Sequence, residues 1–395
     1  MKQLSIKPTI HKFEHARDFA AEFELGKGDL VITNQYIWEP YFGDLNLDCN
    51  VIFQEKYGKG EPSDEMVDEI IRDISASLTT GTTPKRVIGI GGGTVLDISK
   101  VCALKQTSPL EQLVDGKIPV ERGADLVLVP TTCGTGSEVT NVAVFSLTKR
   151  NTKKGLANDA CYATDAVLIP ELLKSLPNYV FATSSIDALT HSIESALSTI
   201  ATDLTKMFSY KACGLILQSY MRVIKEGCSA DANAEAKRGV VGDLVSASLY
   251  AGIAFGNAGC GCVHAMAYPL GGTFHVAHGE TNAALLTNVL RYYAEHDAES
   301  GAENGTQNDG TVSELSKLFD FMAGILECSQ DNVLDKLDEV LNAILPKHKL
   351  HEYGMTVAMI DEWASSVVKE QQRLLRGSYM HMDERAIAEI YKSTF

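Results

Sequence analysis

Residues 86–105 read RVIGIGGGTVLDISKVCALK, and this stretch decides the fold class of the chain. Arg86–Ile90 is a short apolar segment typical of a buried strand, and residues 95–105 have the spacing of a helix. The glycines between them would let backbone N–H groups approach a pyrophosphate at the start of that helix. Thr94 occupies the last position of the usual GxGxxG pattern, so this run alone is a weak indication of a nucleotide site.

The segments on either side of this stretch repeat the alternation of strand and helix. A helix with acidic residues in its first turn is expected after Ser63. Further buried strands are expected at Asp29–Thr33, Asn50–Phe53, Asp125–Val129 and Ala166–Ile169. Short apolar strands that alternate with helices predict a mainly parallel sheet covered by helices on both faces.

After about residue 180 the pattern changes to helical periodicity with few strand signals. The expected helical stretches are 183–199, 203–225, 233–256, 280–294, 313–326, 330–344 and 355–375. The polar, acidic residues 295–312 are expected to form a solvated surface loop. We therefore expect two domains, an α/β domain of residues 1–180 and an all-α domain of residues 181–395.

The composition excludes several classes of partner. The 395 residues include 51 acidic and 35 basic side chains, a formal net charge of −16, which argues against binding to nucleic acid or to anionic membranes. The start, MKQLSIKPTIHKF, has no signal-peptide pattern, and no segment approaches 18 uninterrupted apolar residues, so a cytoplasmic location is expected. The nine cysteines are scattered singly apart from Cys260 and Cys262, which excludes a disulfide framework.

A second informative stretch is GNAGCGCVHAMAYPLGGTFHVAHGETNAALL, residues 256–286, in which His264, His275 and His278 fall within 15 residues. Upstream, Asp187 and His191 are four residues apart and would share one face of a helix. One carboxylate and up to four imidazoles are enough to hold a divalent transition metal. Cys260 and Cys262 are expected to be packing residues, because thiolate ligation would need a further pair that the sequence lacks.

A third motif, PTTCGTGSEVTN (130–141), directly follows the strand expected at Asp125–Val129. Ligands of open α/β sheets bind at the carboxyl ends of the strands. Two loops of this kind, one rich in glycine and one in threonine, favour a nucleotide site over two structural turns. Lys153 and Lys154 could pair with phosphates, although a surface pair of lysines is the ordinary alternative.

The motifs GGGTVLDISK, PTTCGTGSEVTN, DALTHSIE and GCVHAMAYPLGGTFHVAHGETNAALL occur in the order and spacing of one family. Through them the chain resembles the iron-containing (group III) alcohol dehydrogenases over essentially its whole length. The resemblance implies a Rossmann-like N-terminal domain that binds NAD, a helical C-terminal domain, and one ferrous ion in the cleft between them. The metal ligands that it implies are Asp187, His191, His264 and His278, with Zn2+ or another divalent metal as alternatives to Fe2+.

The resemblance also implies a set of cofactor-binding residues. It implies a cradle of Gly91, Gly92, Gly93 and Thr94, with Asp97 in the helix that follows, and a lining of Thr131, Thr132, Thr135, Asn141 and Lys154.

Two positions depart from the family pattern. Tyr268 stands where many members have a further histidine, so proton relay would fall to Tyr268, to His275, or to water and ribose hydroxyls. Asn34 stands at the end of a strand where NAD-specific members often have Asp. Because Asn does not repel the 2′-phosphate of NADP, NADP stays an alternative cofactor.

Other stretches, FQEKYGKGEPSDEM (53–66), NTKKGLA (151–157) and AGIAFGNAG (251–259) among them, resemble the members that oxidise 4-hydroxybutyrate to succinate semialdehyde with NAD in anaerobic bacteria. Arg373 and Arg376 are candidates to bind the substrate carboxylate, the alternative being a solvated helix end. The family also suggests a homodimer. Alternative functions are another primary alcohol or 1,3-diol dehydrogenase of the same family, or a metal- and NAD-dependent lyase of related fold.

Overall fold

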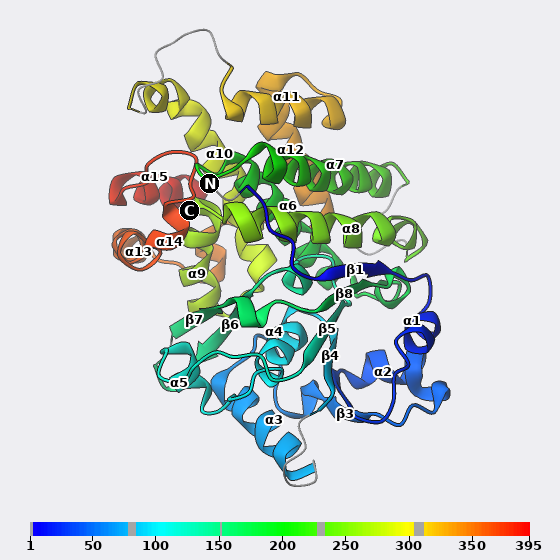
Figure 1. The fold of residues 1–395 in the computed structure, drawn as a ribbon. Coiled ribbons are helices and arrows are strands. Elements are labelled where there is room, and N and C mark those ends of the chain that lie inside the picture. The colour runs from blue at the N-terminus through cyan, green and yellow to red at the C-terminus, as the bar shows by residue number, and fades with distance from the viewer. Residues whose placement is uncertain (1–2, 78–83, 151, 227–233, 304–311) are drawn as a thin grey trace. The chain divides into compact units, whose positions relative to one another are not determined.

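The computed structural model describes residues 3–77, 84–150, 152–226, 234–303 and 312–395 (Figure 1). The chain divides into two compact units. One is Ile6–Leu176, and the other combines Met1–Ser5 with Pro177–Phe395.

The unit Ile6–Leu176 is built on a six-stranded parallel sheet with the strand order β1-β8-β5-β4-β2-β3. The strands are β1 (Thr9–Lys12), β2 (Asp29–Thr33), β3 (Asn50–Phe53), β4 (Arg86–Gly91), β5 (Asp125–Pro130) and β8 (Asp165–Leu168). Every residue of β2 is buried, as expected of a strand covered on both faces. The mainly parallel sheet is confirmed, and β2 and β3 have the predicted bounds.

The helices of this unit are α1 (Ala16–Glu22), α2 (Gln35–Phe42), α3 (Asp64–Ser77), α4 (Gly93–Cys102) and α5 (Leu110–Val114). Helix α4 packs on β4 and β5, where its apolar residues join the core of the sheet. An antiparallel hairpin, β6 (Val142–Leu147) and β7 (Thr152–Ala157), was not predicted.

The helical unit confirms the all-α character predicted for the second half. Its helices are α6 (Asn178–Leu197), α7 (Asp203–Lys225), α8 (Ala234–Ala258), α9 (Cys262–Phe274), α10 (His278–Glu303), α11 (Glu314–Leu326), α12 (Val333–Ile344), α13 (Val357–Glu370), α14 (Gln372–Leu375) and α15 (Glu384–Thr394). The surface loop predicted from residue 295 is wrong as far as residue 303, because α10 continues there, and residues 304–311 lie outside the described chain.

One segment of the described chain, Gly239–Ala258 of α8, is long and apolar enough to cross a membrane. The same helix packs against α6 and α7, and 61% of its most apolar window is buried. Because interior helices of a protein pass this test too, the segment is only weak evidence for a membrane span.

Candidate functional site

Helix α6 brings Asp187 and His191 together in the interior of the helical unit. The helix packs against α7, α8 and α10 and is buried along nearly its whole length. Asp187 and His191 are 5% and 6% exposed. His191 Nδ1 lies 3.9 Å from Asp187 Oδ2, as the four-residue spacing predicts.

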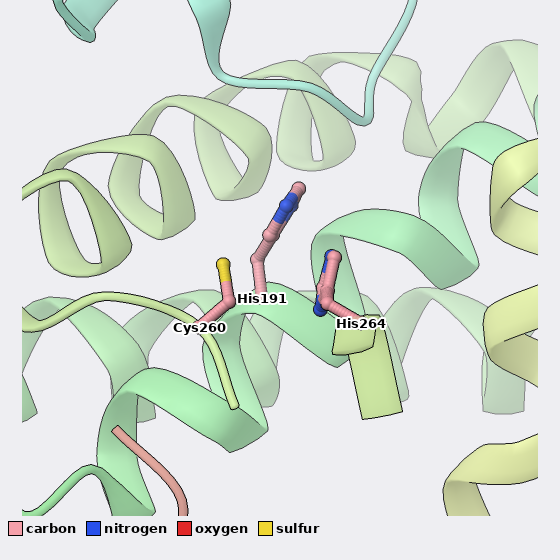
Figure 2. Close-up of side chains that lie close together, drawn as sticks. All are labelled: His191, Cys260 and His264. Atoms are coloured by element: carbon pink, nitrogen blue, oxygen red, sulfur yellow. The ribbon is translucent and has the colours of Figure 1, made fainter. Parts of the chain in front are cut away.

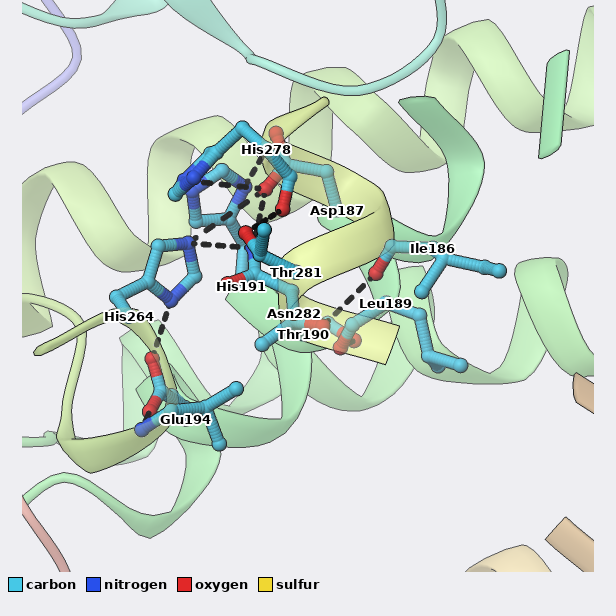
Figure 3. A network of polar contacts seen from close by, with 12 residues as sticks. Ile186, Asp187, Leu189, Thr190, His191, Glu194, His264, His278, Thr281 and Asn282 are labelled. Atoms are coloured by element: carbon cyan, nitrogen blue, oxygen red, sulfur yellow. Dashed lines mark hydrogen bonds and ion pairs between the residues drawn. The ribbon is translucent and has the colours of Figure 1, made fainter. Parts of the chain in front are cut away.

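Helices α9 and α10 bring two further imidazoles to the same carboxylate (Figure 3). Nε2 of His264 lies 3.5 Å from Asp187 Oδ1, and Nε2 of His278 lies 3.7 Å from the same oxygen. The structure therefore brings together all four side chains that the sequence analysis named as metal ligands, with Asp187 at their centre.

The donor set and its spacing fit a divalent metal. With metal–ligand bonds of about 2.1 Å, neighbouring ligand atoms of a tetrahedral site are about 3.4 Å apart. The distances of 3.5 and 3.7 Å around Asp187 are close to that value. His191 Nδ1 is buried and has no hydrogen-bond partner among the described residues, which leaves a polar atom that a ligand would satisfy.

The charges in the cluster support the same conclusion. Burial opposes ionisation of Asp187, but the three imidazoles hold the pKa of this carboxyl below its usual range. Burial lowers the pKa of His191 to about 4. Asp187 and His191 thus have the protonation states in which these groups bind metals. Burial opposes the charge of His264, but Glu194 and Asp187 raise its pKa to about 9, so this imidazole must release a proton when a metal binds.

Two neighbours fix the orientation of these side chains. Asn282, one turn after His278 on α10, donates from Nδ2 to Asp187 Oδ1 at 2.9 Å. Phe255 of α8 stacks on the His191 ring with centroids 4.1 Å apart, and His264 stacks on the other side of that ring at 4.5 Å. These contacts restrict the Asp187 carboxylate and the His191 ring to one orientation each.

Glu194, also on α6, orients His264 from behind. Its carboxylate accepts hydrogen bonds from the backbone N–H groups of Gly261 and Val263, at 2.9 and 2.6 Å, and lies 2.5 Å from His264 Nδ1. Because Nδ1 is held by Glu194, Nε2 is the nitrogen that faces Asp187. The carboxylate also satisfies N–H groups at the start of α9 that have no partner within the helix.

Cys260 lies beside two of the imidazoles (Figure 2). Ligand atoms of His191, Cys260 and His264 lie within 4.8 Å of one another. Burial raises the pKa of the Cys260 thiol well above its ordinary value, so the thiol keeps its proton unless a metal displaces it. The sequence analysis treated Cys260 as a packing residue, whereas the structure places it next to the ligand group.

The two candidates for proton relay occupy different environments. Tyr268, one turn after His264, packs against His278 with ring centroids 5.8 Å apart. His275 is exposed and ends α9 in the left-handed conformation, with φ 55°. Within the described chain, His275 makes no hydrogen bond or ring contact with the four predicted ligands.

A glycine sets the distance between α6 and α10. A Cβ atom added to Gly279 would lie 1.8 Å from the carbonyl oxygen of Thr183, so the two helix backbones are in direct contact there. His278 precedes Gly279, and Asp187 lies one turn after Thr183. This close approach therefore brings His278 to the carboxylate.

The predicted nucleotide loops lie at one position in the sheet of the other unit. The chain passes from β2 to β3 on one side and from β4 to β5 on the other, so the strand order reverses between β2 and β4. Ligands of open α/β sheets bind at such a switch point. Gly91 is the last residue of β4, Gly92 and Gly93 follow it, and the loop 131–140 follows β5, with the backbone N–H of Thr131 donating to Gly91 O at 2.9 Å.

The two loops are so close that side chains would not fit at the glycines. An added Cβ would lie 2.8 Å from Thr135 at Gly93 and 2.5 Å from Val95 at Gly91. Packing alone therefore requires glycine at Gly91 and Gly93, whether or not a ligand is bound. Because glycine has no side chain, the backbone N–H groups at the start of α4 also remain uncovered.

A buried lysine supports the threonine loop. Lys100 of α4 is fully buried and donates to Ser137 Oγ and to Val142 O, both at 2.6 Å. Asp97 accepts from Ser137 Oγ at 2.6 Å. Glu138 is also buried, and in the part of the chain that the structure describes neither of its carboxylate oxygens has a hydrogen-bond partner. Burial raises the pKa of Glu138 to about 7 and lowers that of Lys100.

Several of the other predicted cofactor residues already have protein partners. Lys154 Nζ forms a 2.6 Å ion pair with Asp115, and Asn141 Nδ2 lies 3.5 Å from Asp159. Asn34 is buried at the end of β2. Thr94 Oγ1 donates to Gly60 O at 2.9 Å, while Thr132 is half-buried.

Sequence reasoning missed three supporting residues, although a signal existed for two of them. Glu194 is seven residues after Asp187, and Asn282 is four after His278, so helical spacing places each on the face of a predicted ligand. Lys100 looked like an ordinary helix residue, because its burial depends on the β6 strand and the threonine loop.

Comparisons with known proteins cover the whole chain. The model of the C-terminal part of the Fe-containing alcohol dehydrogenase family matches residues 181–395, and that of iron-containing alcohol dehydrogenase matches residues 10–170. The chain is 43% identical over 395 residues to a 4-hydroxybutyrate dehydrogenase of Clostridium kluyveri, with 100% of both chains covered. It is 34% identical to a long-chain-alcohol dehydrogenase of Geobacillus thermodenitrificans, covering 78% of this chain and 74% of the relative.

Solved structures share the fold. A 1,3-propanediol oxidoreductase has a TM-score of 0.78 at 21% identity, with 100% of both chains covered. A sulfoacetaldehyde reductase from Bifidobacterium kashiwanohense, solved with NAD+, has a TM-score of 0.79 at 21% identity, covering 100% of this chain and 99% of that one.

The substitution Gly279→Ala should weaken metal binding. Its methyl group would collide with the Thr183 carbonyl, so α10 must move and carry His278 away from Asp187. We expect the dissociation constant for Co2+ to rise at least about tenfold, measured by titration of metal-free protein. The matched control is Gly272→Ala in α9, where an added Cβ meets nothing within 4 Å. Equal Co2+ affinity in both variants would contradict the proposed role of the close contact.

The substitution Glu194→Gln should also weaken metal binding, because the amide cannot hold His264 Nδ1–H and two backbone N–H groups together. Changes of this kind typically cost about 10–100-fold in metal affinity. Isothermal titration with Zn2+ measures the loss, with Glu314→Gln, which removes an acid paired to Lys206, as the control. An unchanged Zn2+ affinity in Glu194→Gln would show that Glu194 serves only the helix end.

The substitution Glu138→Gln should change how stability depends on pH. The pKa of Glu138 is about 7 in the folded protein and near its ordinary value when unfolded, so between about pH 5 and 7 only the folded state keeps the proton. Raising the pH through this window therefore lowers the free energy of unfolding, by at most about 1.4 kcal/mol per pH unit.

We expect Glu138→Gln to flatten this part of the profile of thermal midpoint against pH. The control is Glu121→Gln, which removes an exposed carboxylate paired with Lys105. Parallel profiles for wild type and Glu138→Gln would mean that Glu138 is ionised in the folded protein at pH 5.

Proposed function

The chain belongs to the iron-containing alcohol dehydrogenase family, and we propose that it interconverts 4-hydroxybutyrate and succinate semialdehyde, with NAD as hydride carrier and a divalent metal as Lewis acid. The observation that carries the proposal is the 43% identity, over the full length of both chains, to a 4-hydroxybutyrate dehydrogenase. The convergence of three imidazoles on Asp187 supports it independently.

The proposed metal is Fe2+, with Zn2+ or another divalent metal as an alternative. We assign Asp187, His191, His264 and His278 as its ligands. Asp187, His264 and His278 have near-tetrahedral spacing, and His191 Nδ1 lies 3.9 Å from the same carboxylate. When bound, such a metal supplies Lewis acidity that acidifies an alcohol hydroxyl and polarises a carbonyl. In this proposal Glu194 orients His264, Asn282 holds Asp187, and Phe255 holds His191.

The proposed reaction is a hydride transfer. The alcohol carbon gives a hydride to the nicotinamide ring of NAD+, its hydroxyl loses a proton, and the products are the aldehyde, NADH and one proton. We assign Tyr268 as the first candidate to carry that proton, because its ring packs on His278, and His275 as the second.

We propose that the residues implied by the family resemblance bind the cofactor at the switch point of the parallel sheet. They are Asn34, Gly91, Gly92, Gly93, Thr94, Asp97, Thr131, Thr132, Thr135, Asn141 and Lys154. In this proposal, residues 1–180 form the dinucleotide-binding domain and residues 181–395 form the domain that binds metal and substrate. Asp97 acts through the threonine loop, since its carboxylate already accepts from Ser137 Oγ and from the backbone N–H of Val144.

Sequence identity and family membership distinguish the alternative substrates and reactions. The long-chain-alcohol dehydrogenase is 34% identical over 78% of this chain, so another primary alcohol substrate has weaker support than 4-hydroxybutyrate. The 1,3-propanediol oxidoreductase, at 21% identity, shares the fold alone and does not support a 1,3-diol substrate. Family membership favours alcohol oxidation over a metal- and NAD-dependent lyase. We further propose a cytoplasmic homodimer that binds no nucleic acid and no membrane, in keeping with the net charge of −16.

Enzyme prepared without oxygen and loaded with Fe2+ tests the proposal, with loss of NADH absorbance as the readout. Succinate semialdehyde and butanal have four carbons each, but only the former carries a carboxylate. We expect kcat/KM to favour succinate semialdehyde at least about tenfold, as an ion pair to the carboxylate would produce. No oxidation of NADH or NADPH with any aldehyde would overturn the dehydrogenase assignment, and equal rates would favour the uncharged-alcohol alternative.

The variants Arg373→Gln and Arg376→Gln extend the same assay. Both arginines are exposed. The positive charge of Arg373 acts to lower the pKa of the Cys260 thiol, although burial raises that pKa more strongly. Loss of the true carboxylate anchor should raise KM for succinate semialdehyde and leave butanal unchanged. If neither variant does so, the anchor lies elsewhere.

A further inference from the structure

The ends of β2 and β3 place an acidic side chain where the sequence analysis found only Asn34. The two strands are parallel neighbours in register, with Thr33 beside Phe53. The residues that follow, Asn34 on one strand and Gln54 and Glu55 on the other, therefore leave the sheet side by side. This edge adjoins the glycine loop, because β4 is the other neighbour of β2.

The Glu55 carboxylate is held by two donors from the β2 side. Asn34 Nδ2 donates to Oε2 at 2.9 Å, and the backbone N–H of Gln35 donates to Oε1 at 2.7 Å. Asn34 is buried and Glu55 half-buried. Asn34 precedes α2 but makes no side-chain hydrogen bond to that helix, because its amide is turned toward Gln54 and Glu55.

These donors are the ones that an anion would otherwise use. Gln35 is the first residue of α2, and helix starts attract phosphates through free N–H groups and the helix dipole. The first turn of α2 has no acidic residue of its own. Within the described chain, Glu55 is therefore the carboxylate that accepts from the backbone N–H of Gln35 at the start of α2, whereas Glu39 accepts from the Gln35 side chain.

In dinucleotide folds, an acid at the end of the strand beside the glycine-rich loop bonds the adenosine ribose and excludes a 2′-phosphate. We propose that Glu55, held by Asn34 and Gln35 N–H, performs this role and makes the protein selective for NAD over NADP. The inference rests on the proposed dehydrogenase function and deepens it. Asn34 has no charge to repel the 2′-phosphate of NADP. In this proposal Glu55, which follows the neighbouring strand β3, supplies that charge.

The simpler role for Glu55 is to cap α2, and the two roles predict different results. A cap affects stability and leaves the ratio of NADPH to NADH affinity unchanged. A selectivity residue sets that ratio, because its removal takes away a negative charge and frees the Asn34 amide and Gln35 N–H for a 2′-phosphate.

Titration of metal-free protein with NADH and with NADPH, followed by nucleotide fluorescence, separates these roles without relying on activity. Wild type should bind NADH more tightly. Glu55→Gln and Glu55→Ala should each shift the ratio toward NADPH by about tenfold or more, the scale of a charge-assisted contact. Circular dichroism and the thermal midpoint confirm that each variant is folded.

The matched control is Glu39→Gln, which removes an exposed carboxylate of α2 that accepts from the Gln35 side chain. It should leave the ratio unchanged. The inference is overturned if wild type prefers NADPH, or if both folded Glu55 variants bind NADH and keep the wild-type ratio. If wild type binds neither dinucleotide, the proposed dehydrogenase function fails first, and the inference with it.

Discussion

The arrangement of the helical unit depends on the burial of one carboxylate, that of Asp187. A buried ionised acid is unfavourable unless charges and hydrogen bonds replace the water it has lost. Asn282 and the three histidines provide that replacement, and they come from α6, α9 and α10. These contacts hold the three helices together. At Gly279 the backbone of α10 touches the backbone of α6 directly.

The sheet-containing unit also buries an ionisable side chain, in this case the basic group of Lys100. Lys100 is buried beneath the threonine loop, where hydroxyl and carbonyl oxygens surround its ammonium group. The hydrogen bonds run from helix to loop to strand β6, so the lysine fixes loop geometry from inside. In both units a buried ionic group constrains the functional side chains: Asp187 does so from within the ligand cluster, and Lys100 does so from beneath the threonine loop.

The sequence predicted those elements whose signals are local. Strands β2 and β3 were found with their bounds, because each is a short apolar run. Helix α9 was not, since Pro269 and several glycines interrupt its pattern, and its first N–H groups are satisfied by Glu194, which is remote in sequence. The convergence on Asp187 followed from helical spacing and family resemblance, whereas the Glu55 contact needed the pairing of β2 with β3.

Helix α6 carries Asp187, His191 and Glu194 within two turns, and residues of α8, α9 and α10 contact these three side chains. One extra residue between Asp187 and His191 would rotate everything beyond it by about 100° around the helix axis. Glu194 would then point away from α9, and His191 would leave the stack with Phe255. This segment can therefore accept substitutions at its packing positions, but an insertion or deletion between its functional side chains would disrupt the site.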